Sequence, residues 1–299
     1  MRYRFSMARA AWALLICTGL LSAAEPFFLR RNLSAVIPRA DDLTQNAKGA
    51  SYKPVFGIGD PDAGRLQSVA RYGELTVAPG GASATVSYPA EEQIYYILEG
   101  RGALIYGEQR VPVKKDDFMY LPINVPHGIA NETNSPVRVI VMGFKIPPGK
   151  QVATTPQLML SNSADVELQV LGQHGPTTKF KLLMGTRQST RDRLAAASEM
   201  TSLFIMEFLP GGTNIPHSHP REEEIYLLMR GKGEIVAGVT PAGEDARYPA
   251  AAGDVFFFGP NTRVGYYSGA KEGDPPDVIL AVRSMLPPGS GSGSQAVGK

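Results

Sequence analysis

The chain has 299 residues, in which 30 lysines and arginines stand against 28 aspartates and glutamates for a formal net charge of +2 at pH 7. Such a charge gives no cationic field to concentrate polyanions, and no basic stripe interleaved with aromatic residues occurs, so the composition argues against nucleic acid as a partner. Cys17 is the only cysteine, so no disulfide within the chain stabilises the fold.

The N-terminal segment has the pattern of a secretory signal peptide. Three arginines lie in the first nine residues, an apolar run covers residues 10–21, and small residues follow up to Ala24. This run is too short to span a membrane and predicts a signal peptide over residues 1–24. A lipidated Cys17 is the alternative, which the bulky Ile16 before it disfavours. We expect a secreted or periplasmic protein with no membrane partner after cleavage.

The rest of the chain alternates short apolar runs with turn residues. Its 32 glycines and 24 prolines separate runs rich in Val, Ile, Tyr and Phe. This spacing predicts an all-β sandwich or barrel. One short amphipathic helix is predicted around residues 190–199, and a disordered Gly-Ser tail is predicted over residues 290–299.

An internal repeat divides the chain into two halves. Residues 91–95 superpose on residues 222–226 at an offset of 131, and Asp117 falls on Asp254 at an offset of 137. Offsets change only where Gly, Pro and charged residues indicate loops, as expected after duplication of one domain. The repeat predicts an N-terminal domain over residues 47–149 and a C-terminal domain over residues 150–289.

The same strand is predicted in both copies, at residues 93–99 and 224–230. Alternation puts Glu224, Tyr226 and Leu228 on one face and three apolar residues on the other. Because both faces are mostly apolar, we expect the strand to line a barrel on one side and to pack against a second sheet or the sister domain on the other. An apolar outer face would also suit a homodimer.

A candidate metal site stands just before the second of these strands. His217 and His219 lie two residues apart, which points both to one side of a strand, and a turn brings Glu224 back beside them. Imidazole and carboxylate together suit a divalent transition metal such as Mn, Fe, Zn, Ni or Cu. The competing interpretation is that the two histidines are polar residues at a strand entrance.

The spacing of Gly211, His217, His219, Glu224 and Gly231 resembles the first motif of the cupins. The chain is similar to two-domain cupins, or bicupins, over nearly its whole length after the signal peptide. This resemblance implies two tandem jelly-roll barrels, also called double-stranded β-helix or RmlC-like barrels. Proteins of this architecture include oxalate decarboxylases and oxidases, quercetin-type dioxygenases, ureidoglycine aminohydrolases and non-catalytic seed storage proteins.

The sequence departs from the family pattern in both copies. Val264 stands where the second cupin motif supplies another histidine, so one ligand of the C-terminal site is missing. In the N-terminal copy, Tyr88 and Gln93 stand at ligand positions while His127 is retained. We therefore predict a metal-free first barrel, in which Tyr88, Gln93 and His127 form a pocket for an organic ligand or part of the interior. His174 is interpreted as a loop residue without a role.

Two hypotheses for function remain open. The first is a secreted metal-dependent bicupin that acts on a small organic substrate as a dioxygenase-like oxidoreductase, with metal ligands His217, His219 and Glu224. In it Tyr226 or Tyr266 would donate a hydrogen bond from the barrel wall. The second is a non-catalytic secreted cupin that binds a small molecule, and an aminohydrolase resembling ureidoglycine aminohydrolase is a further alternative. Glu222 and Glu223 are interpreted as loop charges.

Overall fold

The computed structural model describes residues 27–152, 157–172 and 174–290. In this part of the chain it is all-β, with twenty strands and three single-turn 3₁₀ helices at Asp42–Thr44, Ala63–Arg65 and Ser163–Asp165. No helix in these ranges is long and apolar enough to cross a membrane. The expected signal peptide, and the tail after residue 290, lie outside the described residues.

The first half forms one strongly curled sheet that closes on itself as a barrel. Its strand order is β10-β7-β4-β9-β3-β8-β5-β6, with β2 paired to β3. The strands are β2 (Lys48–Gly57), β3 (Val69–Ala82), β4 (Glu91–Glu99), β5 (Arg101–Tyr106), β6 (Gln109–Lys114), β7 (Asp117–Leu121), β8 (His127–Ala130), β9 (Val137–Lys145) and β10 (Met159–Asn162).

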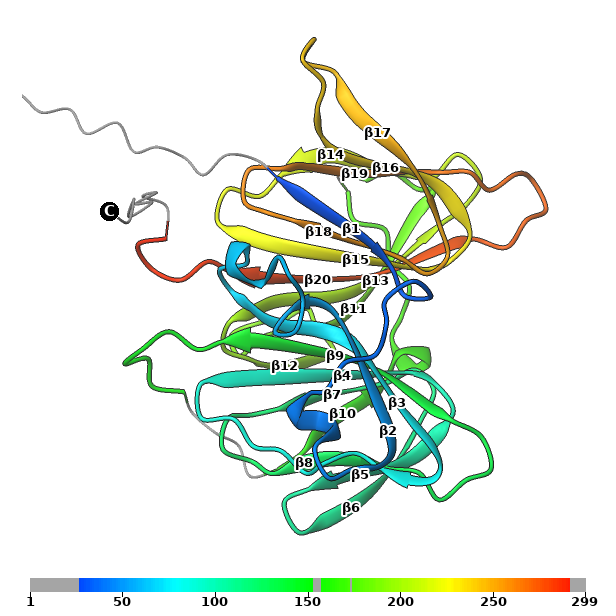
Figure 1. Cartoon of the computed structure of the whole chain (residues 1–299). Coiled ribbons are helices and arrows are strands. Elements are labelled where there is room, and N and C mark those ends of the chain that lie inside the picture. Colours follow the sequence, from blue (N-terminus) through cyan, green and yellow to red (C-terminus); the bar gives the residue numbers. More distant parts are fainter. Residues whose placement is uncertain (1–26, 153–156, 173, 291–299) are drawn as a thin grey trace, which may run out of the picture.

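The second half is a barrel made of two sheets, stacked on the first half in Figure 1. One sheet has the order β1-β18-β15-β20-β13-β11-β12, and the other has the order β14-β19-β16-β17. The strands are β1 (Phe28–Asn32), β11 (Thr178–Thr186), β12 (Leu194–Ala197), β13 (Met200–Phe208), β14 (Thr213–Ser218), β15 (Glu222–Arg230), β16 (Lys232–Val239), β17 (Asp245–Ala251), β18 (Asp254–Phe258), β19 (Arg263–Ser268) and β20 (Asp277–Met285).

The internal repeat reappears as matching strands. The offset of 131 carries β4 onto β15, and the offsets of 137 and 140 carry β7 onto β18 and β9 onto β20, with the same bounds in each case. The order β7-β4-β9-β3 in the first half corresponds to β18-β15-β20-β13 in the second. The all-β fold of two repeated barrels is therefore confirmed.

Each half contributes one strand to the sheet of the other. β1 precedes the first copy in sequence but pairs antiparallel with β18 of the second, with Phe28 opposite Phe258. β10 precedes the second copy but pairs antiparallel with β7 of the first, with Met159 opposite Tyr120. β10 thus belongs to the sheet of the first half although it lies within residues 150–289. The two halves are joined by an exchange of their leading strands.

The core has three parts, one inside each barrel and one between the halves. Alternation along β15 explains this division, because Tyr226 and Leu228 face the interior of the second barrel while Ile225 and Leu227 face the interface. The interface core also takes residues of the first half, such as Ile94 on β4. The prediction that this strand is covered on both sides is therefore confirmed.

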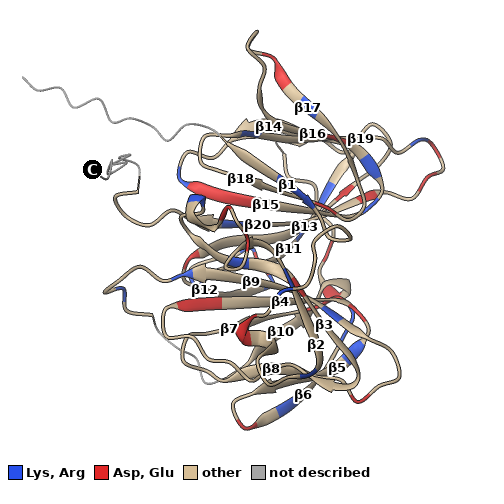
Figure 2. Ribbon diagram, in the orientation of Figure 1, with Lys and Arg blue, Asp and Glu red and all other residues tan. Residues whose placement is uncertain are grey.

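The interface also buries two carboxylates at equivalent positions of the repeat. Glu223 on β15 accepts hydrogen bonds from the backbone N–H groups of Gln67, Ser68 and Val69 at 2.7, 2.8 and 3.1 Å. Glu92 on β4 accepts from three consecutive backbone N–H groups, those of residues 198–200, at 2.8 Å each. Figure 2 shows both strands beginning with acidic residues. The interpretation of Glu223 as a loop charge was wrong, because its carboxylate is buried and accepts hydrogen bonds from backbone N–H groups of the other half.

The predicted helix around residues 190–199 was also wrong. The segment contains the edge strand β12, which runs parallel to β11, with Leu194 opposite Met184. Arg193 precedes it and donates its backbone N–H to the carbonyl of Leu182. The alanine run has helix propensity, but the free edge of β11 offers it sheet hydrogen bonds and burial instead.

Candidate metal centre

The three residues of the candidate site converge at one end of the second barrel. His217 lies on β14, His219 follows the end of that strand, and Glu224 lies on the neighbouring β15. The Nε2 atoms of the two histidines are 3.0 Å apart, and His219 Nε2 is 3.5 Å from Glu224 Oε2. The structure thus brings together the three side chains that the motif spacing selected.

One hydrogen bond fixes the tautomer of His217 and leaves its Nε2 atom as an acceptor. His217 Nδ1 lies 2.7 Å from the carbonyl oxygen of Ile215, to which only a protonated nitrogen can donate. The Nε2 atoms of His217 and His219 form a hydrogen bond at 3.0 Å, which His219 donates when Nε2 of His217 accepts. His219 Nδ1 lies 3.3 Å from Glu222 Oε2, a carboxylate that can hold the ring with Nδ1 protonated and Nε2 free once a metal replaces this bond.

The acceptor atoms fit a small metal ion in chemistry and in spacing. Glu224 Oε2 is buried without any hydrogen-bond partner. Two ligand atoms bound at about 2.1 Å to one ion lie about 3.0 Å apart at right angles and about 3.4 Å apart at a tetrahedral angle. Among the described residues, no group of three or more His, Cys, Asp or Glu side chains is placed to hold a metal ion as it stands. Binding therefore requires the side chains of His217, His219 and Glu224 to move toward a common ion.

Burial sets the protonation of these ligands. It lowers the pKa of His219 to about 3, with Arg283 and His217 acting in the same direction. It also lowers the pKa of His217. Burial raises the pKa of Glu224 to about 7, while Arg283 and a hydrogen bond from Tyr226 act against that rise. At neutral pH both imidazoles are neutral, which is the form that binds metal.

A pocket of about 700 Å³ opens over the three residues. Nine side-chain nitrogen or oxygen atoms are buried without a partner among the described residues, and five of them belong to residues that line this pocket. Buried polar groups are normally satisfied, so their concentration here marks a site that binds something polar. The five atoms are His174 Nδ1, Ser202 Oγ, Asn214 Oδ1, Glu224 Oε2 and Arg283 Nε.

Arg283 places a positive charge at this pocket. It lies on β20 directly opposite Glu224, with its Nε 3.8 Å from Glu224 Oε1 and its Nη1 3.5 Å from both His219 Nε2 and Glu222 Oε2. These contacts are long, and Nε has no hydrogen-bond partner. The guanidinium is therefore available to an anion.

The first barrel also has a buried arginine near the equivalent place, but acidic side chains pair with it. Arg71 and Gly143 face each other on β3 and β9, where the repeat places Ser202 and Arg283 in the second half. Arg71 donates to Glu91 at 2.8 Å and to Asp42 at 2.7 Å. Of these two arginines, only Arg283 keeps a buried guanidinium nitrogen without a hydrogen-bond partner.

The other predicted pocket residues divide between the two barrels. Tyr226 lines the pocket and accepts a hydrogen bond from Asn214 at 2.8 Å, whereas Tyr266 turns to Asp277 at 2.9 Å and is not among the lining residues. Tyr266 therefore belongs to the barrel core rather than to the pocket wall.

His127, Gln93 and Tyr88 come together in the first barrel. His127 Nε2 is 2.9 Å from Gln93 Oε1, its Nδ1 is 2.8 Å from the carbonyl of Val125, and its ring centre is 6.0 Å from that of Tyr88. Burial lowers the pKa of His127 to about 4. Both ring nitrogens of His127 are engaged in hydrogen bonds, so neither is free to bind a metal.

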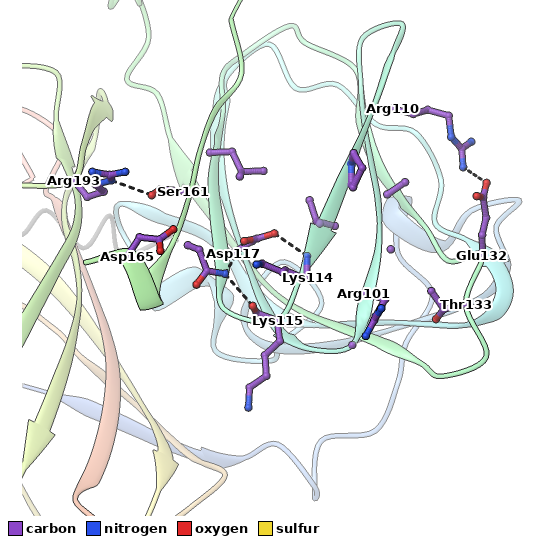
Figure 3. Close-up of a pocket in the computed structure, with 17 residues that line it drawn as sticks. Arg101, Arg110, Lys114, Lys115, Asp117, Glu132, Thr133, Ser161, Asp165 and Arg193 are labelled. Carbon is purple, nitrogen blue, oxygen red and sulfur yellow. Dashed lines mark hydrogen bonds and ion pairs between the residues drawn. The ribbon is translucent and has the colours of Figure 1, made fainter. Parts of the chain in front are cut away.

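A larger hollow of about 1190 Å³ lies on the first half beside β5 and β6. Figure 3 shows two of its arginines engaged with neighbours: Arg110 pairs with Glu132, and Arg193 donates to Ser161 at 3.1 Å. No lining residue carries a buried unpartnered side-chain nitrogen or oxygen. This hollow therefore lacks the converging free polar atoms of the second-barrel pocket.

Three residues of the site were not identified from the sequence in their present roles. Arg283 interrupts the apolar strand Asp277–Met285, and a charge inside such a strand was an available signal. Glu222 orients His219, although it was interpreted as a loop charge. His174 was assigned no role but lies against His217, and only the folded chain shows this proximity.

Comparison with known proteins places the same regions in one family. The family described as "Cupin domain" matches residues 73–143 and 204–272. Germin-like protein subfamily 2 member 1 of Arabidopsis thaliana is 32% identical over 166 residues, which are 54% of this chain and 67% of that protein. An uncharacterized protein of Methanocaldococcus jannaschii is 36% identical over 71 residues, 24% of this chain and 57% of that protein. Oxalate oxidase 1 of Hordeum vulgare is 50% identical over 38 residues, 13% of this chain and 18% of that protein. Several matched relatives are thus spanned only in part.

Solved structures share the fold over most of both chains. A protein from Pseudomonas aeruginosa described as a glyoxylate-induced protein has a TM-score of 0.67 at 15% identity, covering 95% of this chain and 94% of its own. The oxalate decarboxylase of Lactobacillus farciminis, in a formate complex, has a TM-score of 0.62 at 15% identity, covering 87% and 86%. That of Bacillus subtilis, whose Mn(II) centres have been characterised, has a TM-score of 0.60 at 14% identity, covering 86% and 77%.

Proposed function

Because this chain belongs to the cupin family and gathers His217, His219 and Glu224 in its second barrel, we propose that it is a metal-dependent oxidoreductase acting on a small organic acid. One observation carries the proposal: five buried polar atoms without partners face one pocket of about 700 Å³. Acceptors gather on the side of the histidines and Glu224, and the guanidinium of Arg283, whose Nε has no hydrogen-bond partner, lies beside them. This arrangement suits a cation and an anion bound next to each other.

The chain's own residues would hold the metal and orient it. His217 and His219 would bind it through Nε2, because Nδ1 of each ring is turned to an acceptor. Glu224 would bind through Oε2, and Tyr226, which takes a hydrogen bond from Asn214, fixes the position of that carboxylate. A bound transition metal would supply Lewis acidity and redox chemistry at this point.

Arg283 supports an acidic substrate. A guanidinium binds a carboxylate through two parallel hydrogen bonds, and Arg283 has an unpartnered Nε at the edge of the site. Phe204, which lies under the guanidinium at 5.4 Å, and Phe180 supply apolar walls that exclude water. Oxalate oxidase and oxalate decarboxylase, named among the relatives, act on a small dicarboxylate by their names. Export to the periplasm or the exterior, from the expected signal peptide, is part of this proposal.

Metal analysis of the purified protein tests the proposal first. We expect about one equivalent of a transition metal, with Mn the first candidate because one structural neighbour has Mn(II) centres. His217→Ala should remove it. A metal content below about a tenth of an equivalent, unchanged in that variant, would favour a non-catalytic binding protein. Oxygen uptake with a panel of small acids and phenols then distinguishes an oxidoreductase from a metal-binding protein without turnover.

A further inference from the structure

We propose that His174 is a further protein ligand of the metal centre, supplied by the segment that leads into β11. The inference rests on the proposed metal function of His217, His219 and Glu224. It concerns a residue outside the motif that holds those three.

The position at which the second cupin motif supplies another histidine cannot provide a metal ligand in this chain. Val264 on β19 lies directly opposite His217 on β14, is 1% exposed, and packs into the apolar interior of the barrel. A further ligand therefore has to come from another segment. Of the four histidines in the chain, His127 lies in the other barrel and the remaining three line one pocket.

His174 is held at the edge of this pocket by both backbone and ring contacts. Its backbone N–H donates to the carbonyl of Leu171 at 2.9 Å, and its ring centre lies 5.0 Å from that of Phe180 on β11. Its ring centre is 5.8 Å from that of His217, with the two planes at 62°. The half-buried imidazole is thus next to a candidate ligand.

The free nitrogen of His174 indicates a missing partner. Nδ1 is buried and accepts or donates no hydrogen bond. Leaving a buried polar atom unpaired is unfavourable, so such an atom points to a partner that binds there. His174 lies beside Glu224 and Arg283 in a pocket where other polar atoms are also unpaired.

The ring spacing is that of imidazoles on one ion. A nitrogen bound at about 2.1 Å puts the ring centre about 3.2 Å from the metal, so two rings lie about 4.6 Å apart at right angles and about 6.5 Å apart when opposite. His217 and His219 are 4.7 Å apart, and His174 and His217 are 5.8 Å apart. Both distances lie within this range, so the spacing of His174 from His217 is compatible with two rings bound to the same ion.

The test compares metal binding by the wild-type protein and by His174→Phe, using the full chain freed of metal and then titrated with Cu²⁺. Phenylalanine keeps the ring contact with Phe180 but removes both nitrogens, and thermal melts should show that the variant folds. We expect Cu²⁺ affinity to fall by about 10- to 100-fold or more, and pulsed EPR to count three bound imidazoles in the wild type and two in the variant. In the double variant that carries both His174→Phe and Val264→His, the new histidine should restore the third imidazole, at the position where the second cupin motif supplies one.

The outcomes separate the two proposals. If the wild-type protein binds Cu²⁺ but His174→Phe has the same affinity and the same number of bound imidazoles, His174 is not a ligand and the proposed function stands. If the wild-type protein binds no Cu²⁺ in this pocket, both the metal function and the role of His174 are wrong.

Discussion

Replacing Glu223 by alanine is expected to lower the melting temperature by roughly 6–12 °C. Glu223 is 1% exposed and accepts from three backbone N–H groups at the start of β3 and in the turn before it. The hydroxyl of Ser68, which also donates to it, keeps Ser284 as a partner at 2.7 Å. Three buried donors at about 1–3 kcal/mol each give a cost of at least about 3 kcal/mol. For a chain of this size, 1 kcal/mol shifts the melting temperature by about 2–4 °C.

Thermal melts followed by circular dichroism measure this shift, with Glu234→Ala as the matched control. Glu234 is also a strand carboxylate, but its side chain is 51% exposed and it pairs with Arg247 at 3.5 Å. An exposed pair of this kind contributes about 0–1 kcal/mol. The reasoning fails if Glu223→Ala melts no lower than Glu234→Ala, because the buried N–H groups would then find other acceptors at no cost.

The other predictions concern the two barrels. Metal affinity should rise about tenfold from pH 6 to pH 8, because the pKa of Glu224 is about 7 and only its carboxylate form binds metal. A metal affinity that stays constant between pH 6 and pH 8 would contradict this role of Glu224. Arg283→Met should raise the KM for small carboxylates about 10- to 150-fold, since a charge-assisted hydrogen bond contributes about 1.5–3 kcal/mol. The KM for neutral phenols should not change. An equal rise in KM for both substrate classes would show that Arg283 does not bind the carboxylate. His127→Asn should leave the metal content unchanged at about one equivalent, and a drop would show that the first barrel binds metal.

The strands were predictable because the repeat compares the sequence with itself. The copies at residues 93–99 and 224–230 constrained each other, and the alternation along them gave the two apolar faces found in the structure. The same alternation carried information that was not used. It places Glu223 on the face of Ile225 and Leu227, where a charge has to meet a partner in the other half.

The remaining errors concern contacts between distant segments. Residues 190–199 have helix propensity, and only the neighbouring edge of β11 decides for a strand. His174 and His217 are separated in sequence by three complete strands, β11 to β13, so no spacing rule links them. Motif spacing found His217, His219 and Glu224 because these three are local. The sequence could not show that Tyr266 lies in the barrel core, because only the folded chain brings Asp277 within hydrogen-bond distance of its hydroxyl.

The exchange of leading strands has a consequence for how the molecule is made. β1 is synthesised well before β18, yet Asn32 bonds Asp254, which is 222 residues further along the chain. The second barrel therefore cannot close its edge with material of its own copy, and β1 must wait unpaired until β18 has emerged. Pairing across such a separation is slow and leaves strand edges open to other chains. Either half expressed alone would therefore present an unpaired edge at β7 or β18.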